Sequence, residues 1–291
     1  MSTWDKADQH FIGCDIAYDL ADAVVFGAPF DATTSYRPGT RLACRTMRAE
    51  SYSIETYSPY QNLDLTDFAI FDGGDMELPF GNPTKALRLI ETQASQILAD
   101  QKLPLMIGGE HLVTLGAVRA AYKRFPDLHL LHFDAHADVR QHYIGERYSH
   151  ATVMRRCWDL VGDGHLHQFG IRSGDKEEFN WISQHTSCSR FGFAGLEDTI
   201  QSLSGKPVYL SIDLDILDPA VFPGTGTPEA GGVSFNELLQ AIRKVSELPI
   251  VGCDLTELSP PLDISGISTA TALKIMRELL LAILQKRQNR S

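Results

Sequence analysis

The sequence predicts an α/β protein built around a mainly parallel β-sheet that helices cover on both faces. Two observations predict it: short apolar runs recur along the 291 residues, and stretches with helical periodicity separate most of them. Strands that are buried on both faces have this nearly continuous apolar character. The eight runs lie at residues 23–27, 67–72, 103–109, 128–133, 165–171, 190–195, 207–212 and 249–255.

Three of the intervening helices carry clear sequence signals. Residues 83–101 place their apolar side chains on one face, with Asn82 as the N-cap and Pro83 at the first helical position. Residues 234–246 begin with a capping box formed by Ser234 and Glu237, and residues 269–286 are strongly helical.

The organisation of the chain indicates one domain but leaves its architecture open. No repeat or long linker interrupts the pattern, so we expect residues 1–291 to form a single domain. Eight strands are compatible with an open sheet between helices and with a closed (β/α)8 barrel, and the spacing alone does not choose between them.

Composition excludes several classes of protein. The net charge is −11 and no cluster of Lys and Arg is present, which argues against a nucleic-acid binder and is compatible with a cationic substrate. No apolar stretch reaches membrane-spanning length, and the N-terminus shows no signal peptide. The five cysteines are scattered without a C-x-x-C pair, as is typical of reduced thiols, so we expect a cytoplasmic protein.

Ionisable residues follow four of the predicted strands directly. In parallel α/β folds ligands bind at the carboxyl ends of the strands, so these residues are expected to converge at one edge of the sheet. They are Glu110 and His111 after 103–109, Asp134, His136 and Asp138 after 128–133, Asp213 and Asp215 after 207–212, and Glu257 after 249–255.

Six of these residues form a candidate metal site. His111, His136 and the four aspartates sum to −4 when the imidazoles are neutral, which matches two divalent cations. A mixed carboxylate and imidazole set suits Mn(II) best, with Fe, Co, Ni or Zn as alternatives. Helix caps, turns and surface ion pairs would explain an isolated D-x-D, but they do not explain the whole set. His132 is expected to face away from this cluster.

At these residues the sequence resembles the ureohydrolases, the family that includes arginase and agmatinase. The matching motifs are GGEH at 108–111, DAHAD at 134–138 and SIDLDILDP at 211–219, followed by PGTGTPEAGG at 223–232. The resemblance implies a three-layer α/β/α sandwich around an eight-stranded, mostly parallel sheet, which disfavours the barrel.

The resemblance also implies a ligand set for two metal ions. Asp134 and Asp213 would bridge them, His111 and Asp138 would complete one site, and His136 and Asp215 would complete the other. Glu110 stands where many members carry Asp, and it is not a ligand.

Three residues receive catalytic or substrate-binding roles by the same resemblance. Glu257 matches a carboxylate that pairs with a guanidinium, which prefers a bidentate partner. His150 matches a histidine proposed to shuttle protons, a role that suits an imidazole near its free pKa. Asp138 would orient the nucleophile in addition to binding metal.

The implied reaction is hydrolysis of a guanidino compound to urea. Residues 139–156, SYRPGTR (35–41) and YSIETYSP (52–59) look like the agmatinase branch, so agmatine is the expected substrate, putrescine the product and polyamine synthesis the pathway. Arg37, Arg140 or Arg147 at the mouth would instead favour guanidinobutyrate or guanidinopropionate. Arginine and a non-catalytic metal-binding relative remain alternatives. Family members are commonly trimers or hexamers, so a homo-oligomer is expected.

Overall fold

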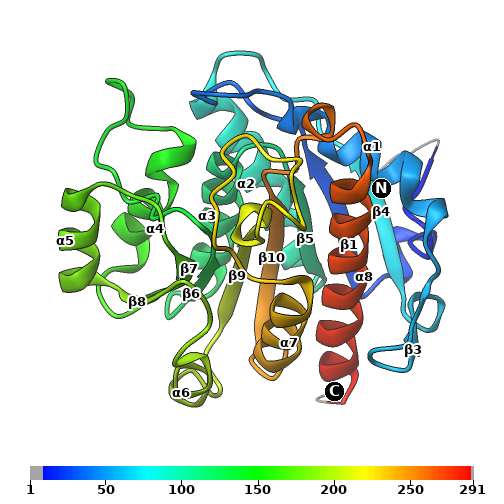
Figure 1. Cartoon of the computed structure of the whole chain (residues 1–291). Coiled ribbons are helices and arrows are strands. Elements are labelled where there is room, and N and C mark those ends of the chain that lie inside the picture. The colour runs from blue at the N-terminus through cyan, green and yellow to red at the C-terminus, as the bar shows by residue number, and fades with distance from the viewer. Residues whose placement is uncertain (1–8, 290–291) are drawn as a thin grey trace.

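A computed structural model describes residues 9–289. Its core is an eight-stranded sheet in the order β4-β1-β5-β10-β9-β6-β7-β8 (Figure 1). Every pairing between these strands is parallel. The strands are β1 (Ala23–Ala28), β4 (Ile70–Asp75), β5 (Leu103–Gly108), β6 (His129–Phe133), β7 (Leu166–Ile171), β8 (Ser187–Arg190), β9 (Val208–Asp213) and β10 (Ile250–Thr256).

Helices cover both faces of this sheet and complete three layers. Helices α1, α6, α7 and α8 contribute to the core on one face, and α2, α3, α4 and α5 to the core on the other. Figure 1 shows α7 and α8 in front of the sheet and α2 and α3 behind it. The helices are α1 (Ala43–Glu50), α2 (Pro83–Ala99), α3 (Thr114–Arg124), α4 (Val153–Val161), α5 (Lys176–His185), α6 (Leu196–Ser202), α7 (Phe235–Val245) and α8 (Ile267–Gln288).

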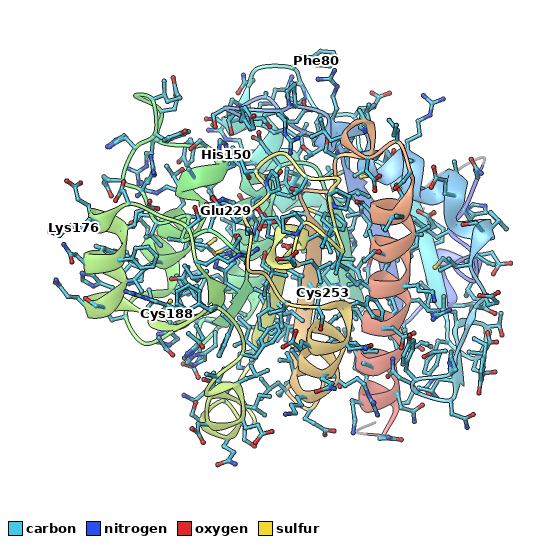
Figure 2. All side chains as sticks on the ribbon, in the orientation of Figure 1. Phe80, His150, Lys176, Cys188, Glu229 and Cys253 are labelled. Atoms are coloured by element: carbon cyan, nitrogen blue, oxygen red, sulfur yellow. The ribbon has the colours of Figure 1, made fainter. Side chains whose placement is uncertain are left out.

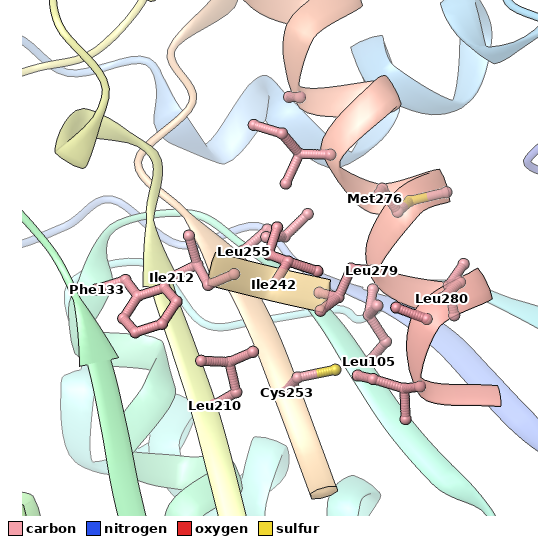
Figure 3. Packing of buried hydrophobic residues seen from close by; sticks show 14 of the residues in the cluster. Leu105, Phe133, Leu210, Ile212, Ile242, Cys253, Leu255, Met276, Leu279 and Leu280 are labelled. Carbon is pink, nitrogen blue, oxygen red and sulfur yellow. The ribbon is translucent and has the colours of Figure 1, made fainter. Parts of the chain in front are cut away.

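Alternation along each strand explains why both faces are apolar. In β6, Leu131 and Phe133 belong to the core beneath α7 and α8, whereas Leu130 belongs to the opposite core. Figure 3 shows side chains of the central strands, such as Leu210 and Leu255, packed with Leu279 on the α8 side. The predicted open sandwich is therefore confirmed, and the barrel is excluded because the sheet ends at β4 and β8.

Two predicted strands are displaced in the structure. The run at 190–195 is not a strand: β8 ends at Arg190, and both Phe191 and Gly195 take left-handed backbone conformations that turn the chain. The run at 67–72 begins too early, because Asp64 caps a short 3-10 helix at Leu65–Asp67 and the strand starts only at Ile70. A small antiparallel pair, β2 (Tyr57–Ser58) and β3 (Leu63–Asp64), was not predicted from the sequence.

The strand order sets the location of the site. Strands β5, β10, β9 and β6, which carry the ionisable residues at their carboxyl ends, are consecutive neighbours in the middle of the sheet. None of the helices within 9–289 is both long and apolar enough to cross a membrane. Part of the N-terminal stretch in which no signal peptide is expected, residues 1–8, lies outside the described residues.

Candidate metal and substrate site

Close backbone packing after β5 positions the first candidate ligand. A Cβ on Gly109 would lie 2.0 Å from the carbonyl oxygen of Phe30, so only glycine fits between the two segments. The amide of Glu110 donates to that same carbonyl at 2.8 Å. The chain then enters a 3-10 turn, His111–Val113, and the His111 side chain is buried over the sheet edge.

The ring of His111 lies among three carboxylates. Its Nδ1 is 3.0 Å from Oδ2 of Asp134, 3.2 Å from Oδ2 of Asp138 and 3.3 Å from Oδ2 of Asp213. Its Nε2 lies 2.9 Å from Oγ of Ser211, whose hydroxyl donates to Asp254 at 2.7 Å. Since Ser211 has a single hydrogen to donate, Nε2 of His111 must donate to Ser211. In the neutral ring the Nδ1 lone pair then faces the three carboxylates.

His136 forms the second half of the cluster. Its Nδ1 lies 2.9 Å from Oδ2 of Asp215 and 3.6 Å from Oδ1 of Asp134. Asp134 thus presents one oxygen to His111 and the other to His136. Asp213 is tied to Asp215 as well, because its Oδ1 accepts the Asp215 amide at 2.9 Å.

The donor set fits two cations. Two groups of potential ligand atoms share Asp134: one contains His111, His132 and Asp138, and the other contains His136 and Asp215. Within the described chain, Nδ1 of His111 and Oδ2 of Asp215 are buried and make no well-directed hydrogen bond, although each lies close to an atom of the cluster. Buried polar atoms without partners are costly, and one cation in each group would satisfy the two atoms.

The electrostatics of the cluster show an excess of negative charge. Burial, together with the charges of Asp215 and Asp134, raises the pKa of Asp213 well above its ordinary value. Burial and the charge of Asp134 raise the pKa of Asp138 to about 7. Burial alone would lower the pKa of His111, but the carboxylates of Asp134, Asp138 and Asp213 around its ring raise it well above the usual value. Cations other than protons would relieve the same repulsion.

Comparison with known proteins places the chain in a family. A model of the arginase family matches residues 21–282. The chain is 44% identical over 279 residues to an agmatinase of Bacillus subtilis, covering 94% of this chain and 96% of that protein. It is 37% identical to a guanidinobutyrase of Pseudomonas aeruginosa, covering 90% of this chain and 86% of that protein.

The chain belongs to the arginase family. A solved structure agrees: the agmatine ureohydrolase of Thermoplasma volcanium superimposes with a TM-score of 0.89 at 34% identity, covering 98% of this chain and 97% of that one. An arginase of Bacillus subtilis, at 24% identity and a TM-score of 0.75, shares the fold.

In this arginase-family protein a cavity of about 320 Å³ opens over the cluster. Glu257 and Asp138 both line it, and both have left-handed backbones, with φ of 65° and 54°. Residues other than glycine rarely take this backbone conformation, and those that do are concentrated at functional sites. Oε1 of Glu257 accepts the His111 amide at 2.7 Å, and burial raises the pKa of Glu257 to about 8, helped by the charge of Glu110.

His150 also lines the cavity. It begins the 3-10 turn His150–Thr152, its Nε2 is 3.2 Å from Oγ of Ser35, and its ring meets the edge of Tyr143. Burial and nearby positive charge lower its pKa to about 4. The ring is therefore neutral at pH 7, and its role as a proton shuttle stays a prediction.

The three arginines flagged in the sequence behave differently. Arg37 donates to the carbonyl oxygens of Thr225 and Gly226, and Arg147 pairs with Asp159 at 3.1 Å. Neither lines the cavity. Arg140 does line it, but its guanidinium is 3.1 Å from Glu178 and 3.5 Å from Asp175.

The structure corrects the expectation for His132 and adds supporting residues that the sequence analysis missed. His132 does not face away: its Nε2 lies 2.7 Å from Oδ2 of Asp134. Residues two apart in a strand share a face, so the spacing of His132 and Asp134 already contained this signal. The pairing of Ser211 with Asp254 had no such local signal, because it joins β9 to β10.

Glu110 is also missed as an organiser of the site. It is fully buried, and its carboxylate accepts the amide and hydroxyl of Thr33 at 2.9 and 2.7 Å and the hydroxyl of Thr34 at 3.1 Å. Thr33 in turn accepts the amide of His150 at 3.2 Å. Glu110 therefore connects the loop after β1 to the wall that carries His150.

Proposed function

We propose that this protein hydrolyses agmatine to putrescine and urea at a centre that holds two divalent metal ions. Membership of the arginase family and 44% identity to an agmatinase over nearly the whole length support this reaction. The agmatine ureohydrolase among the solved structures supports the same substrate. The balanced reaction adds one water across the bond between the guanidinium carbon and the alkyl nitrogen.

The six clustered side chains are the proposed ligands. His111 and Asp138 would hold one ion, His136 and Asp215 the other, and Asp134 and Asp213 both. Mn(II) is the ion we propose, since its preference for oxygen and imidazole donors matches the set. Bound ions would supply an activated water and stabilise the charge that develops in the transition state.

Three residues of the chain would act on the substrate. Glu257, buried at the cavity wall, would hold the guanidinium by a bidentate, charge-assisted pair. Asp138 would orient the attacking water by accepting its hydrogen bond. His150, neutral at pH 7, would accept a proton and pass it to the leaving amine.

The state of Arg140 is the observation that favours a cationic tail over an acidic one. Within the described part of the chain it is the only Arg or Lys that lines the cavity, and two carboxylates, Asp175 and Glu178, neutralise it. The three residues together carry one net negative charge. Glu229 adds another nearby: its Oε1 accepts the hydroxyl of Ser173 on the cavity wall at 2.8 Å and lies 3.8 Å from Nε2 of His136. An ammonium tail meets attraction there, whereas a carboxylate tail finds no unpaired cation.

The test measures urea release from agmatine, arginine, guanidinobutyrate and guanidinopropionate by the Mn(II)-loaded protein, together with its metal content. We expect about two ions per chain and preference for agmatine. Arg140→Gln should keep that preference, because the arginine does not bind the tail. Preference for a guanidino acid that disappears in Arg140→Gln would contradict the proposed substrate.

Three broader proposals accompany this function. All five cysteines are free thiols, which supports the cytoplasm as the location. The eight-stranded sheet contains strands from both halves of the chain, β1 and β10 among them, which supports a single domain over residues 1–291. Two large apolar side chains are nearly or fully exposed, Phe80 at 96% (Figure 2) and Ile264 at 103%, which supports a homo-oligomer such as a trimer or hexamer.

A further inference from the structure

A second group of imidazole and carboxylate side chains lies at the amino ends of the strands, opposite the carboxyl ends that carry the metal cluster. His129 is the first residue of β6, Asp127 lies two residues before it, and His165 immediately precedes β7. The parallel pairing brings the starts of these strands together, and the Leu130 amide donates to the His165 carbonyl at 2.7 Å. Potential ligand atoms of Asp127, His129 and His165 all lie within 4.8 Å of one another. The length of β6 separates this group from Asp134 by about 16 Å.

His129 supplies a buried nitrogen without a partner. The residue is only 3% exposed, and its Nδ1 lies 3.3 Å from Nε2 of His167. Its Nε2 is buried and makes no hydrogen bond. Burial lowers the pKa of both His129 and His167 to about 4, helped by the charge of His165 when its ring is protonated and by the charge of Lys206. Both rings are therefore neutral at pH 7, the form in which histidine binds metals.

His165 is held in a tautomer that leaves its other nitrogen available. Its Nδ1 lies 3.0 Å from the carbonyl oxygen of Asp163, which can only accept a hydrogen bond, so Nδ1 carries the hydrogen. In the neutral ring the Nε2 lone pair then lies 3.4 Å from a carboxylate oxygen of Asp127. In that form two acceptors face each other, and a cation between them, either a proton or a metal ion, would be stabilised by both. The carbonyl contact at Nδ1 is also the support that metal-binding histidines use.

We propose that Asp127, His129 and His165 bind one Zn(II) ion, separate from the catalytic centre. Two imidazoles and one carboxylate suit Zn(II), which leaves a fourth position for water. The ring of His165 now stacks on that of His129, with centroids 4.3 Å apart, so it must turn to bring its Nε2 onto the ion. Its side chain is 28% exposed and that of Asp127 is 69% exposed, so both have room to move.

The charge balance and the location indicate what the ion would do. The charge of Lys206 lowers the pKa of His129 and opposes a cation, whereas the carboxylate of Asp127 acts in the other direction. The three ligands come from the segment before β6, from β6 and from the segment before β7. A bound ion would therefore link the starts of two neighbouring strands and stabilise the folded state by mass action.

The test titrates Zn(II) into the Mn(II)-loaded protein and follows heat of binding, zinc content and Tm. The variants are Asp127→Asn and His165→Gln, whose side chains are exposed enough that folding should be unaffected. His185→Gln is the matched control, because His185 also pairs with an aspartate, Asp163, at 2.8 Å but is part of no three-ligand group among the described residues.

We expect the native chain and the control to bind one zinc ion per chain that both site variants bind at least tenfold more weakly. The rise in Tm with zinc should shrink in parallel, while the variants release urea as the native chain does. Zinc exchanging into the catalytic centre would affect all four proteins equally: the native protein, the two site variants and the control. Equal zinc affinity in all four would overturn the proposal, as would zinc uptake by none. These readouts do not require activity, so they stand apart from the proposed reaction.

Discussion

At the scale of single residues, Glu257 combines three unusual properties. It is 7% exposed, its backbone is left-handed, and its carboxylate is held by the amide of His111. Such a side chain is oriented before any substrate arrives, so little ordering remains to be done on binding.

Glu257→Gln should keep its metal and lose turnover. The amide preserves size and one acceptor but removes the charge that pairs with a guanidinium, so kcat/KM should fall by about a hundredfold to a thousandfold. Urea release and metal content measured on the same preparation check this, with the exposed Glu146→Gln as control. Unchanged kcat/KM would mean that the guanidinium binds elsewhere.

The contact of Ser211 with His111 makes a separate prediction. Ser211→Ala removes the acceptor for Nε2 of His111 and frees that ring to change tautomer. Supports of this kind typically contribute tenfold to a hundredfold to metal affinity. Dialysis against graded chelator should show this loss, and Ser202→Ala, which removes only an exposed hydroxyl bonded to the Thr199 carbonyl, should not. Equal metal retention in the two variants would show that the contact is dispensable.

At the scale of elements, the turn after β5 depends on the absence of a side chain. Gly109→Ala would push a Cβ to 2.0 Å from the carbonyl of Phe30, where the obstacle is backbone and cannot rotate away. We expect a loss of about 3 kcal/mol in the free energy of unfolding. Gly192→Ala, where nothing lies within 4 Å, should change it by less than about 0.5 kcal/mol. Urea denaturation compares the two, and similar midpoints would contradict the steric argument.

The elements also show where local sequence information is sufficient. The helix predicted at 83–101 is α2, Pro83–Ala99, because its cap and apolar stripe are local features. The capping box of Ser234 and Glu237 likewise starts α7 as predicted. The run at 190–195 was wrongly predicted as a strand, because an apolar side chain can also pack on the core from a loop. The ring of Phe193 packs in this way on Phe133, with centroids 4.9 Å apart.

At the scale of the whole molecule, the buried histidines predict how stability depends on pH. The pKa of His129 and of His167 is about 4 in the folded state, against about 6.5 in the unfolded chain. Between these values the unfolded chain binds more protons, so acid favours unfolding. The contribution of these two histidines to stability is full above about pH 6.5 and is lost as the pH falls towards 4.

His167→Gln should weaken this acid dependence. Glutamine does not titrate, so the variant should lose about 1 to 3 kcal/mol less than the native chain between pH 7 and pH 4. Denaturation curves across that range at constant metal concentration provide the measurement. The carboxylates of the metal cluster affect both chains alike, so two parallel profiles would show that His167 makes no such contribution.

The sequence by itself determined the fold class and the candidate ligands. Strand periodicity and the placement of charge at strand ends are local properties, and parallel strands necessarily bring their carboxyl ends to one edge. His111, Asp134, His136, Asp138, Asp213 and Asp215 could therefore be named in advance, and the structure brings all six together.

Only the tertiary structure decided how those groups are surrounded. Glu178, the partner of Arg140, lies 38 residues away, and Glu110 reaches Thr33 across 77. No local pattern encodes pairings at such separations, because they depend on the order in which strands join the sheet. The tertiary structure decided that Arg140 is the arginine lining the cavity and that burial keeps His150 neutral. It also decided that Asp127, His129 and His165 meet at the amino ends of β6 and β7.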